Sequence, residues 1–97
     1  MINFPLDEPL APAVARRLIQ HIWRNGVVSY SRHARARMVS HGMRRLECEQ
    51  VLRSGWVMPG EWEHGTWRYR VRTQNATVVV TFLSIQELVV VTTWRER

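Results

Sequence analysis

The sequence predicts an α+β fold in which N-terminal helices pack on one face of a three- to four-stranded antiparallel meander sheet. Two observations predict this class. Apolar residues recur at helical spacing as far as Ser54, and from Trp56 onward the period changes to two. A chain of 97 residues is long enough for one hydrophobic core and too short for two. We therefore expect a single domain over residues 1–97, in which residues 1–26 add an N-terminal helix to a core of residues 27–97.

The first helix is expected from about Ala11 to Asn25. Its apolar residues follow one another at the four-residue spacing of an amphipathic helix: Leu10, Val14, Leu18 and Ile22. Pro12 suits the first turn of a helix and Gly26 suits its end. This helix is either part of the core or an added docking helix that places the domain in a larger assembly. Residues 27–30 then form a short extended link or strand.

Ser31 is expected to cap the second helix, because its hydroxyl can accept a hydrogen bond from a free amide of the first turn. The helix should end near Gly42, since glycine readily takes the left-handed conformation after a last turn. Two lines of side chains run along it about 60° apart. They are an apolar line (Tyr30, Ala34 and Met38) and a polar line (His33, Arg37 and His41). The polar line borders the buried one, which suits a functional site, and a structural role for His33 and Arg37 is the alternative.

A third helix is expected from Glu47 to Ser54. Four apolar residues should share its buried side: Leu46, Cys48, Val51 and Leu52. Met43, just before it, should pack against the second helix.

The remaining segments alternate as strands do. Segments 56–58 and 61–63 flank a loop at Pro59–Gly60. Segment 66–73 places Trp67, Tyr69 and Val71 on one face and Arg68, Arg70 and Arg72 on the other, which indicates a half-buried strand with an arginine face. After a turn at Gln74–Asn75, segment 77–84 is apolar on both faces, as a central strand would be. Segment 88–94 is the last strand.

The charge of the chain points to an anionic partner. The formal net charge is +6, and all 14 basic residues are arginines. Arginine presents a planar fork for phosphate and stacks on bases, so RNA, DNA or an acidic protein is the expected partner. The single cysteine, Cys48, cannot form an internal disulfide. No apolar run is long enough to span a membrane, and the first 12 residues do not form a secretory signal, so we expect a cytoplasmic protein.

Other chemistries have little support in the sequence. The four histidines and Cys48 show no compact metal-ligand spacing, so no metal site is expected. No glycine loop that cradles phosphate and no nucleophile elbow is present, so we expect no cofactor.

The run Ser31-x-His33-Ala34-x-x-Arg37-Met38, followed by the Gly42 turn and an arginine-rich strand, resembles a family. It is similar to a small bacterial domain family of uncharacterised function that looks like the BrnT toxins of the RelE/ParE superfamily. The resemblance covers roughly residues 27–94. It implies a RelE/BrnT-like fold, an RNA-binding basic surface and an antitoxin partner. Site residues implied by position are His33 and Arg37, with Arg70 in the basic strand. The chain ends after its last strand without the tyrosine-bearing helix of the RelE branch, which argues against ribosome-dependent cleavage.

The first hypothesis is therefore a toxin-like, metal-independent endoribonuclease. His33 would transfer the proton, while Arg37 and Arg70 would hold the phosphate. Further RNA contacts are assigned to Arg68, Arg72, Arg32 and Arg45. The second proton carrier stays open between His41 and Glu63. The alternative hypothesis is a non-catalytic module that binds nucleic acid or protein, or a subunit of a larger assembly, with the strand arginines solvated or in contact with that partner.

Overall fold

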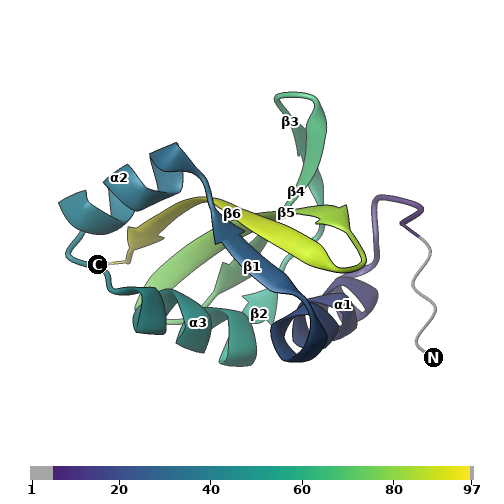
Figure 1. Ribbon diagram of the computed structural model, residues 1–97, viewed down its shortest axis with the longest axis horizontal. Coiled ribbons are helices and arrows are strands. Elements are labelled where there is room, and N and C mark those ends of the chain that lie inside the picture. Colours follow the sequence, from purple (N-terminus) through teal and green to yellow (C-terminus); the bar gives the residue numbers. More distant parts are fainter. Residues whose placement is uncertain (1–5, 97) are drawn as a thin grey trace.

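The structure, a computed structural model, describes residues 6–96 as three helices and six strands (Figure 1). The helices are α1 (Pro12–Asn25), α2 (Arg32–Ser40) and α3 (Arg45–Ser54). The strands are β1 (Val27–Tyr30), β2 (Trp56–Val57), β3 (Glu61–Glu63), β4 (Thr66–Arg72), β5 (Ala76–Ser84) and β6 (Glu87–Arg95). The α+β class is therefore confirmed. Residues 1–5 and residue 97 lie outside the described residues. Residues 1–5 belong to the segment that is expected not to be a secretory signal.

The sheet differs from the predicted one in size and in strand direction. Its order is β1-β6-β5-β4-β2, and β3 also pairs with β4. The other pairs are antiparallel, but β1 runs parallel to β6, with Val27 opposite Glu87 and Tyr30 opposite Val90. The prediction of a three- to four-stranded antiparallel meander is therefore wrong. A parallel pair needs a long crossover, here everything from α2 to β5, so no local turn signal announces it.

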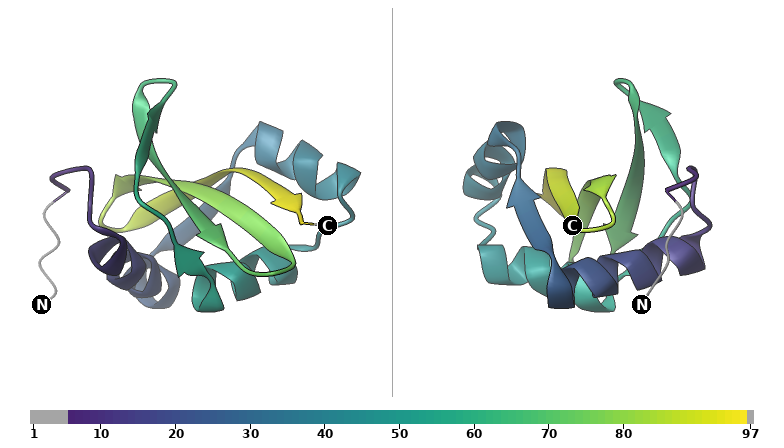
Figure 2. Two further views of the ribbon diagram at one scale, coloured as in Figure 1. Left: turned by 180° about the vertical axis from the view of Figure 1, so that it is seen from behind. Right: turned by 45° about the vertical axis from the view of Figure 1, so that its right-hand side comes forward.

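Helices α1 and α3 pack on one face of the sheet, which we call the core face (Figure 2). Leu18 and Ile22 of α1 and Val51 of α3 are buried there among sheet residues such as Val78 and Val80. The apolar face of α1 is thus buried in the core of the chain itself. No helix within residues 6–96 is both long and apolar enough to span a bilayer.

The third helix buries three of its four predicted residues. Cys48, Val51 and Leu52 are buried, but Leu46 is 62% exposed. Leu46 precedes Cys48 by two residues, which turns its side chain about 200° around the helix and away from the core. The prediction for Leu46 is therefore wrong.

Helix α2 stands apart from the other two helices, beside the second half of β6 (Figure 2). The Ser31 amide donates to the Val90 carbonyl at 3.0 Å, and the Ser31 hydroxyl accepts from the Ala34 amide at 3.0 Å, which confirms the predicted cap. The same hydroxyl donates to the Val91 carbonyl at 3.1 Å. Helix α2 therefore continues along the edge of β6 where β1 stops. The prediction that the helices pack on one face of the sheet is therefore correct for α1 and α3 and wrong for α2, which covers an edge of the sheet.

Strand β5 is the central strand, as predicted, and its residues from Ala76 to Phe82 are buried. The side chains of Val78 and Val80 enter the core face. Thr77, Val79 and Thr81 therefore point to the opposite side, which α1 and α3 leave uncovered and which we call the outer face.

Candidate nucleic-acid interface

Three arginines of β4 lie on the outer face. Tyr69 and Val71 are fully buried in the core. Because side chains alternate along a strand, Arg68, Arg70 and Arg72 point the other way. We call these three residues the arginine row. The predicted alternation of this strand is confirmed by the burial of its other residues.

A line of four side chains crosses the outer face at Arg72, and we call it the transverse row. Residues opposite one another in neighbouring strands present their side chains on the same face. Arg72 lies opposite Trp56 of β2 and also opposite Thr77 of β5. Thr77 in turn lies opposite Trp94 of β6. The order across the sheet is therefore Trp56, Arg72, Thr77, Trp94, with a cation between two indoles.

A second line crosses the face at Arg70. Arg70 lies opposite Val79, and Val79 lies opposite Thr92. The Arg70 guanidinium carbon reaches to 5.7 Å from the centre of the Trp94 ring, within the range of a cation–π contact. A hollow of about 80 Å³ lies here between β3, β4 and β6. A hollow of this size makes the outer face an open platform rather than a deep active-site cleft.

Carboxylates accompany the arginine row. Arg70 Nε lies 3.5 Å from Glu61 Oε1, and Arg72 Nη2 lies 3.9 Å from Glu96 Oε1. Glu96 Oε1 also accepts hydrogen bonds from Thr77 Oγ1 at 2.7 Å and Trp94 Nε1 at 2.9 Å, which lower the pKa of this carboxyl. Glu61 and Glu96 thus hold the side chains of Arg70 and Arg72 in place. Exposed ion pairs of this kind contribute only about 0–1 kcal/mol, so a phosphate can replace the carboxylates.

His33 and Arg37 lie on the rim of the outer face. Ala34 is buried against the sheet, and Met38 packs on the core side. Helix geometry then places Arg37 about 60° from Ala34 on the other side, with His33 beyond it. His33 is exposed, and among the described residues no hydrogen bond or ion pair holds its ring. The described contacts do not join His33 or Arg37 to Arg70, so the three predicted site residues do not form one cluster.

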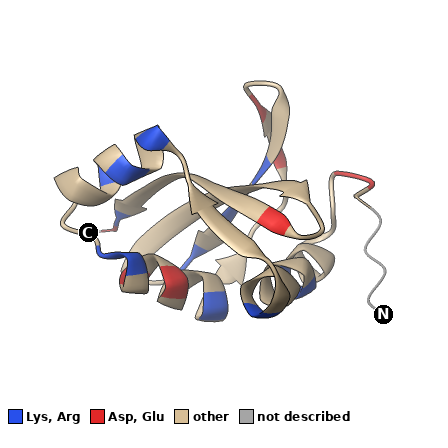
Figure 3. Ribbon diagram, viewed as in Figure 1, with Lys and Arg blue, Asp and Glu red and all other residues tan. Residues whose placement is uncertain are grey.

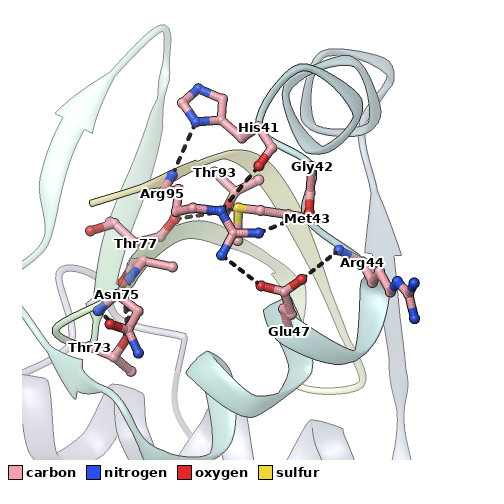
Figure 4. A network of polar contacts seen from close by, with 11 residues as sticks. His41, Gly42, Met43, Arg44, Glu47, Thr73, Asn75, Thr77, Thr93 and Arg95 are labelled. Atoms are coloured by element: carbon pink, nitrogen blue, oxygen red, sulfur yellow. Dashed lines mark hydrogen bonds and ion pairs between the residues drawn. The ribbon is translucent and has the colours of Figure 1, made fainter. Parts of the chain in front are cut away.

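His41 has a structural role instead. Its Nδ1 accepts a hydrogen bond from the Arg95 amide at 3.2 Å, and its carbonyl accepts from Arg95 Nε at 3.1 Å (Figure 4). A neutral imidazole that accepts at Nδ1 carries its proton on Nε2. His41 thus ties the end of α2 to the end of β6, and its Nδ1 is already occupied.

Arg95 extends this tie to α3. Its guanidinium donates to the Gly42 carbonyl at 2.8 Å and lies 3.0 Å from Glu47 Oε2. The Glu47 carboxylate also accepts from the Arg44 amide at 3.3 Å, at the start of α3. The hydrogen bond from Arg95, followed by that from Arg44, lowers the pKa of Glu47. Arg95 therefore joins α2, α3 and β6, a role that no local pattern in the sequence indicates.

The remaining predicted contacts lie elsewhere. Arg45 lies on α3, which covers the core face and not the outer face. Its guanidinium carbon is 5.3 Å from the centre of the Tyr30 ring, and its Nε is 3.4 Å from Glu49 Oε1. Arg32 begins α2 and is exposed, about 160° around the helix from buried Ala34. Figure 3 shows basic residues on all three helices as well as on β4. Charge alone therefore does not single out one face of the molecule.

Two other side chains bear on the predicted chemistry. Glu63, an open choice for proton transfer, lines the hollow beside Arg68 and Arg70. Cys48 is fully buried, and this burial raises the pKa of its thiol, so it is no nucleophile. Within residues 6–96, no three His, Cys, Asp or Glu side chains are grouped to hold a metal ion.

Sequence reasoning missed Trp56 and Trp94. Neither residue shows its role in a local pattern, because only the register across four strands brings them into line with Arg72. Trp56 is 67% exposed on a strand that pairs with β4 alone, so its indole is available to a ligand. One signal in the sequence bears on Trp56 and Trp94. It is the alternation of β4, which places Arg72 on the outer face.

Comparisons of this chain with protein-family models, with curated proteins and with solved structures find no match.

Proposed function

We propose that this protein binds single-stranded RNA on the outer face of its sheet. The observation that carries the proposal is the transverse row, in which Arg72 lies between Trp56 and Trp94. Proteins bind single strands by combining cations that follow the phosphates with aromatic rings on which unpaired bases stack. The arginine row supplies the cations, and the two indoles supply the stacking surfaces.

The carboxylates of the face give the proposal a specific consequence. Glu61 holds Arg70 before RNA binds, and a phosphate takes its place afterwards. Removing the Glu61 charge should therefore strengthen RNA binding, because the phosphate no longer competes with a carboxylate for the arginine. A surface that binds a cationic partner would respond in the opposite direction.

Cleavage of the bound RNA is the second candidate function. It is favoured by the position of His33, an exposed imidazole on the rim of the same face with Arg37 beside it. An imidazole can serve as a general base for a 2′-hydroxyl. In this form the protein is a toxin-like, metal-independent endoribonuclease with a RelE/BrnT-like fold that acts in the cytoplasm. An acidic antitoxin protein would then compete with RNA for the arginine row.

Binding is tested with a fluorescently labelled RNA of about 12 nucleotides, offered as a single strand and as a duplex. We expect the single strand to bind more tightly, because stacking on Trp56 and Trp94 needs bases that are free of a duplex. Glu61→Gln should bind the single strand more tightly than wild type does. Equal binding of both forms of RNA, with no effect of Glu61→Gln, would contradict the proposal.

Cleavage is tested separately on the same RNA with a chelator present. The wild type, His33→Ala and the control His64→Asn are compared, because His64 is also an exposed histidine but lies at the tip of the β3–β4 turn. Asparagine is chosen there because the His64 φ of 50° is one that asparagine tolerates. Products that disappear only with His33→Ala assign the proton transfer to His33. Identical behaviour of the three proteins removes His33 from catalysis and leaves the binding proposal intact.

A further inference from the structure

The largest hollow described in the molecule lies at the end of the sheet, between α3 and the β4–β5 turn. We call it the end groove, and its volume is about 660 Å³. Small-molecule sites typically measure about 300–1,000 Å³. In Figure 4, Asn75 of the turn and Glu47 of α3 lie on opposite sides of it.

The end groove adjoins the outer face at two residues of the transverse row. Trp56 and Arg72 line the groove and also belong to that row. A strand of RNA whose phosphates follow the arginine row would therefore arrive at the mouth of the groove when it passes Arg72. The exposed indole of Trp56 stands at this point.

The free polar groups inside the groove are carboxamides. Gln50, Gln74 and Asn75 line it, and no hydrogen bond of the described residues occupies the amide groups of these side chains. Each carboxamide offers both a donor and an acceptor. Asparagine and glutamine use this pair to bind the edge of a nucleobase.

The two cations that line the groove, Arg72 and Arg95, are each already paired with a carboxylate. Arg95 is bound by Glu47 and by the carbonyls of His41 and Gly42. An acidic peptide would only replace one carboxylate by another at these arginines, whereas the free groups of the groove are neutral. Neutral donors and acceptors beside an exposed indole fit an uncharged, flat group instead.

We propose that the end groove is a specificity pocket for one unpaired nucleobase, which stacks on Trp56 and is identified by the carboxamides of Gln50, Gln74 and Asn75. The proposal rests on the proposed function, because the RNA backbone on the arginine row delivers this base. It goes further in stating that binding depends on sequence. A platform of arginines and indoles alone would bind most sequences alike.

The test compares dissociation constants for labelled single strands of poly-A, poly-C and poly-U. We expect wild type to prefer one of them by about tenfold or more over the weakest. The double variant Gln50→Ala/Gln74→Ala should lose that preference while it still binds RNA. Gln86→Ala is the matched control, because Gln86 is an exposed glutamine in the β5–β6 turn at the other end of the sheet.

A second measurement reports on the pocket without phosphate. The four ribonucleosides are titrated into ¹⁵N-labelled protein, and the side-chain amide signals of Gln50, Gln74 and Asn75 are followed. One nucleoside should shift these signals and the indole signal of Trp56. Circular dichroism of the double variant checks that it is folded, which is expected because Gln50 and Gln74 are exposed.

Each outcome decides between the two proposals. RNA binding with the same base preference in wild type and double variant overturns the pocket and leaves the proposed function standing. No RNA binding by wild type overturns both. Shifts of the carboxamide signals by an oligoglutamate peptide, with none by any nucleoside, would assign the groove to an acidic protein segment and also overturn the pocket.

Discussion

Replacing two cations of the arginine row should change the salt dependence of RNA binding by a definite amount. Each phosphate that is neutralised on a single strand contributes about 0.7 to the slope of log K against log salt. Three contacts from Arg68, Arg70 and Arg72 give a slope of about −2.1, which weakens binding about 18-fold between 50 and 200 mM salt. Arg70→Gln/Arg72→Gln leaves one contact, a slope of about −0.7 and a weakening of about 2.6-fold.

The assay is fluorescence anisotropy of a labelled single strand over that salt range. Arg17→Gln/Arg24→Gln is the matched control, because it also removes two positive charges, but from exposed positions on α1. Stability should hardly change, since the ion pairs lost with Arg70 and Arg72 are exposed and contribute about 0–1 kcal/mol each. Equal slopes for the two double variants would refute the assignment of phosphates to the row.

Three further predictions concern stability. Leu18→Ala should lower the free energy of unfolding by about 3 kcal/mol, because Leu18 is fully buried. The control Val39→Ala, at an 83% exposed site, should change it by less than about 0.5 kcal/mol. Similar losses for the two variants in urea denaturation would mean that α1 is not part of the core. Gly26→Ala should cost about 3 kcal/mol, because its Cβ would lie 2.1 Å from a backbone carbonyl oxygen of the β5–β6 turn, and a loss near zero would contradict that approach. Arg95 lowers the pKa of Glu47 below its ordinary 4.5, so the carboxylate adds stability above that pH that is lost as the pH falls through the lowered pKa. Glu47→Gln should therefore be less stable than wild type at pH 7 but not well below pH 4.5, and a difference that is constant with pH would rule this out.

Local patterns in the sequence predicted the local structure. Ser31 caps α2, Gly42 follows that helix with a φ of 62°, and the turn at Gln74–Asn75 joins β4 to β5. These features depend on residues only a few positions apart, so their signals are contained in short windows. The alternation of β4, which puts its arginines on one face, is a signal of the same kind.

Apart from the exposure of Leu46, the parts that the sequence did not predict depend on distant pairing. Val27 meets Glu87 and Tyr30 meets Val90 across about 60 positions, so β1 could be read only as a link or strand. Trp56 and Trp94 acquire their place beside Arg72 from the registers of three strand pairs. None of these registers follows from composition or spacing, because each is set by packing of the whole sheet.

The candidate site depends on distant pairing in the same way. The run from Ser31 to Met38 predicts a site at His33 and Arg37, but these two residues lie on the rim of the outer face. The centre of that face is built by β2, β4, β5 and β6, whose side chains meet only in the folded sheet.

The most direct test of RNA binding on the outer face uses the tryptophans as reporters. Indole Nε1–H signals of the ¹⁵N-labelled protein are followed while an unlabelled single-stranded RNA is added. The signals of Trp56 and Trp94 should shift, while that of Trp23, which lies on α1 beside Arg53, should stay in place. A shift of the Trp23 signal, with the signals of Trp56 and Trp94 unchanged, would place the RNA on α1 and contradict binding on the outer face.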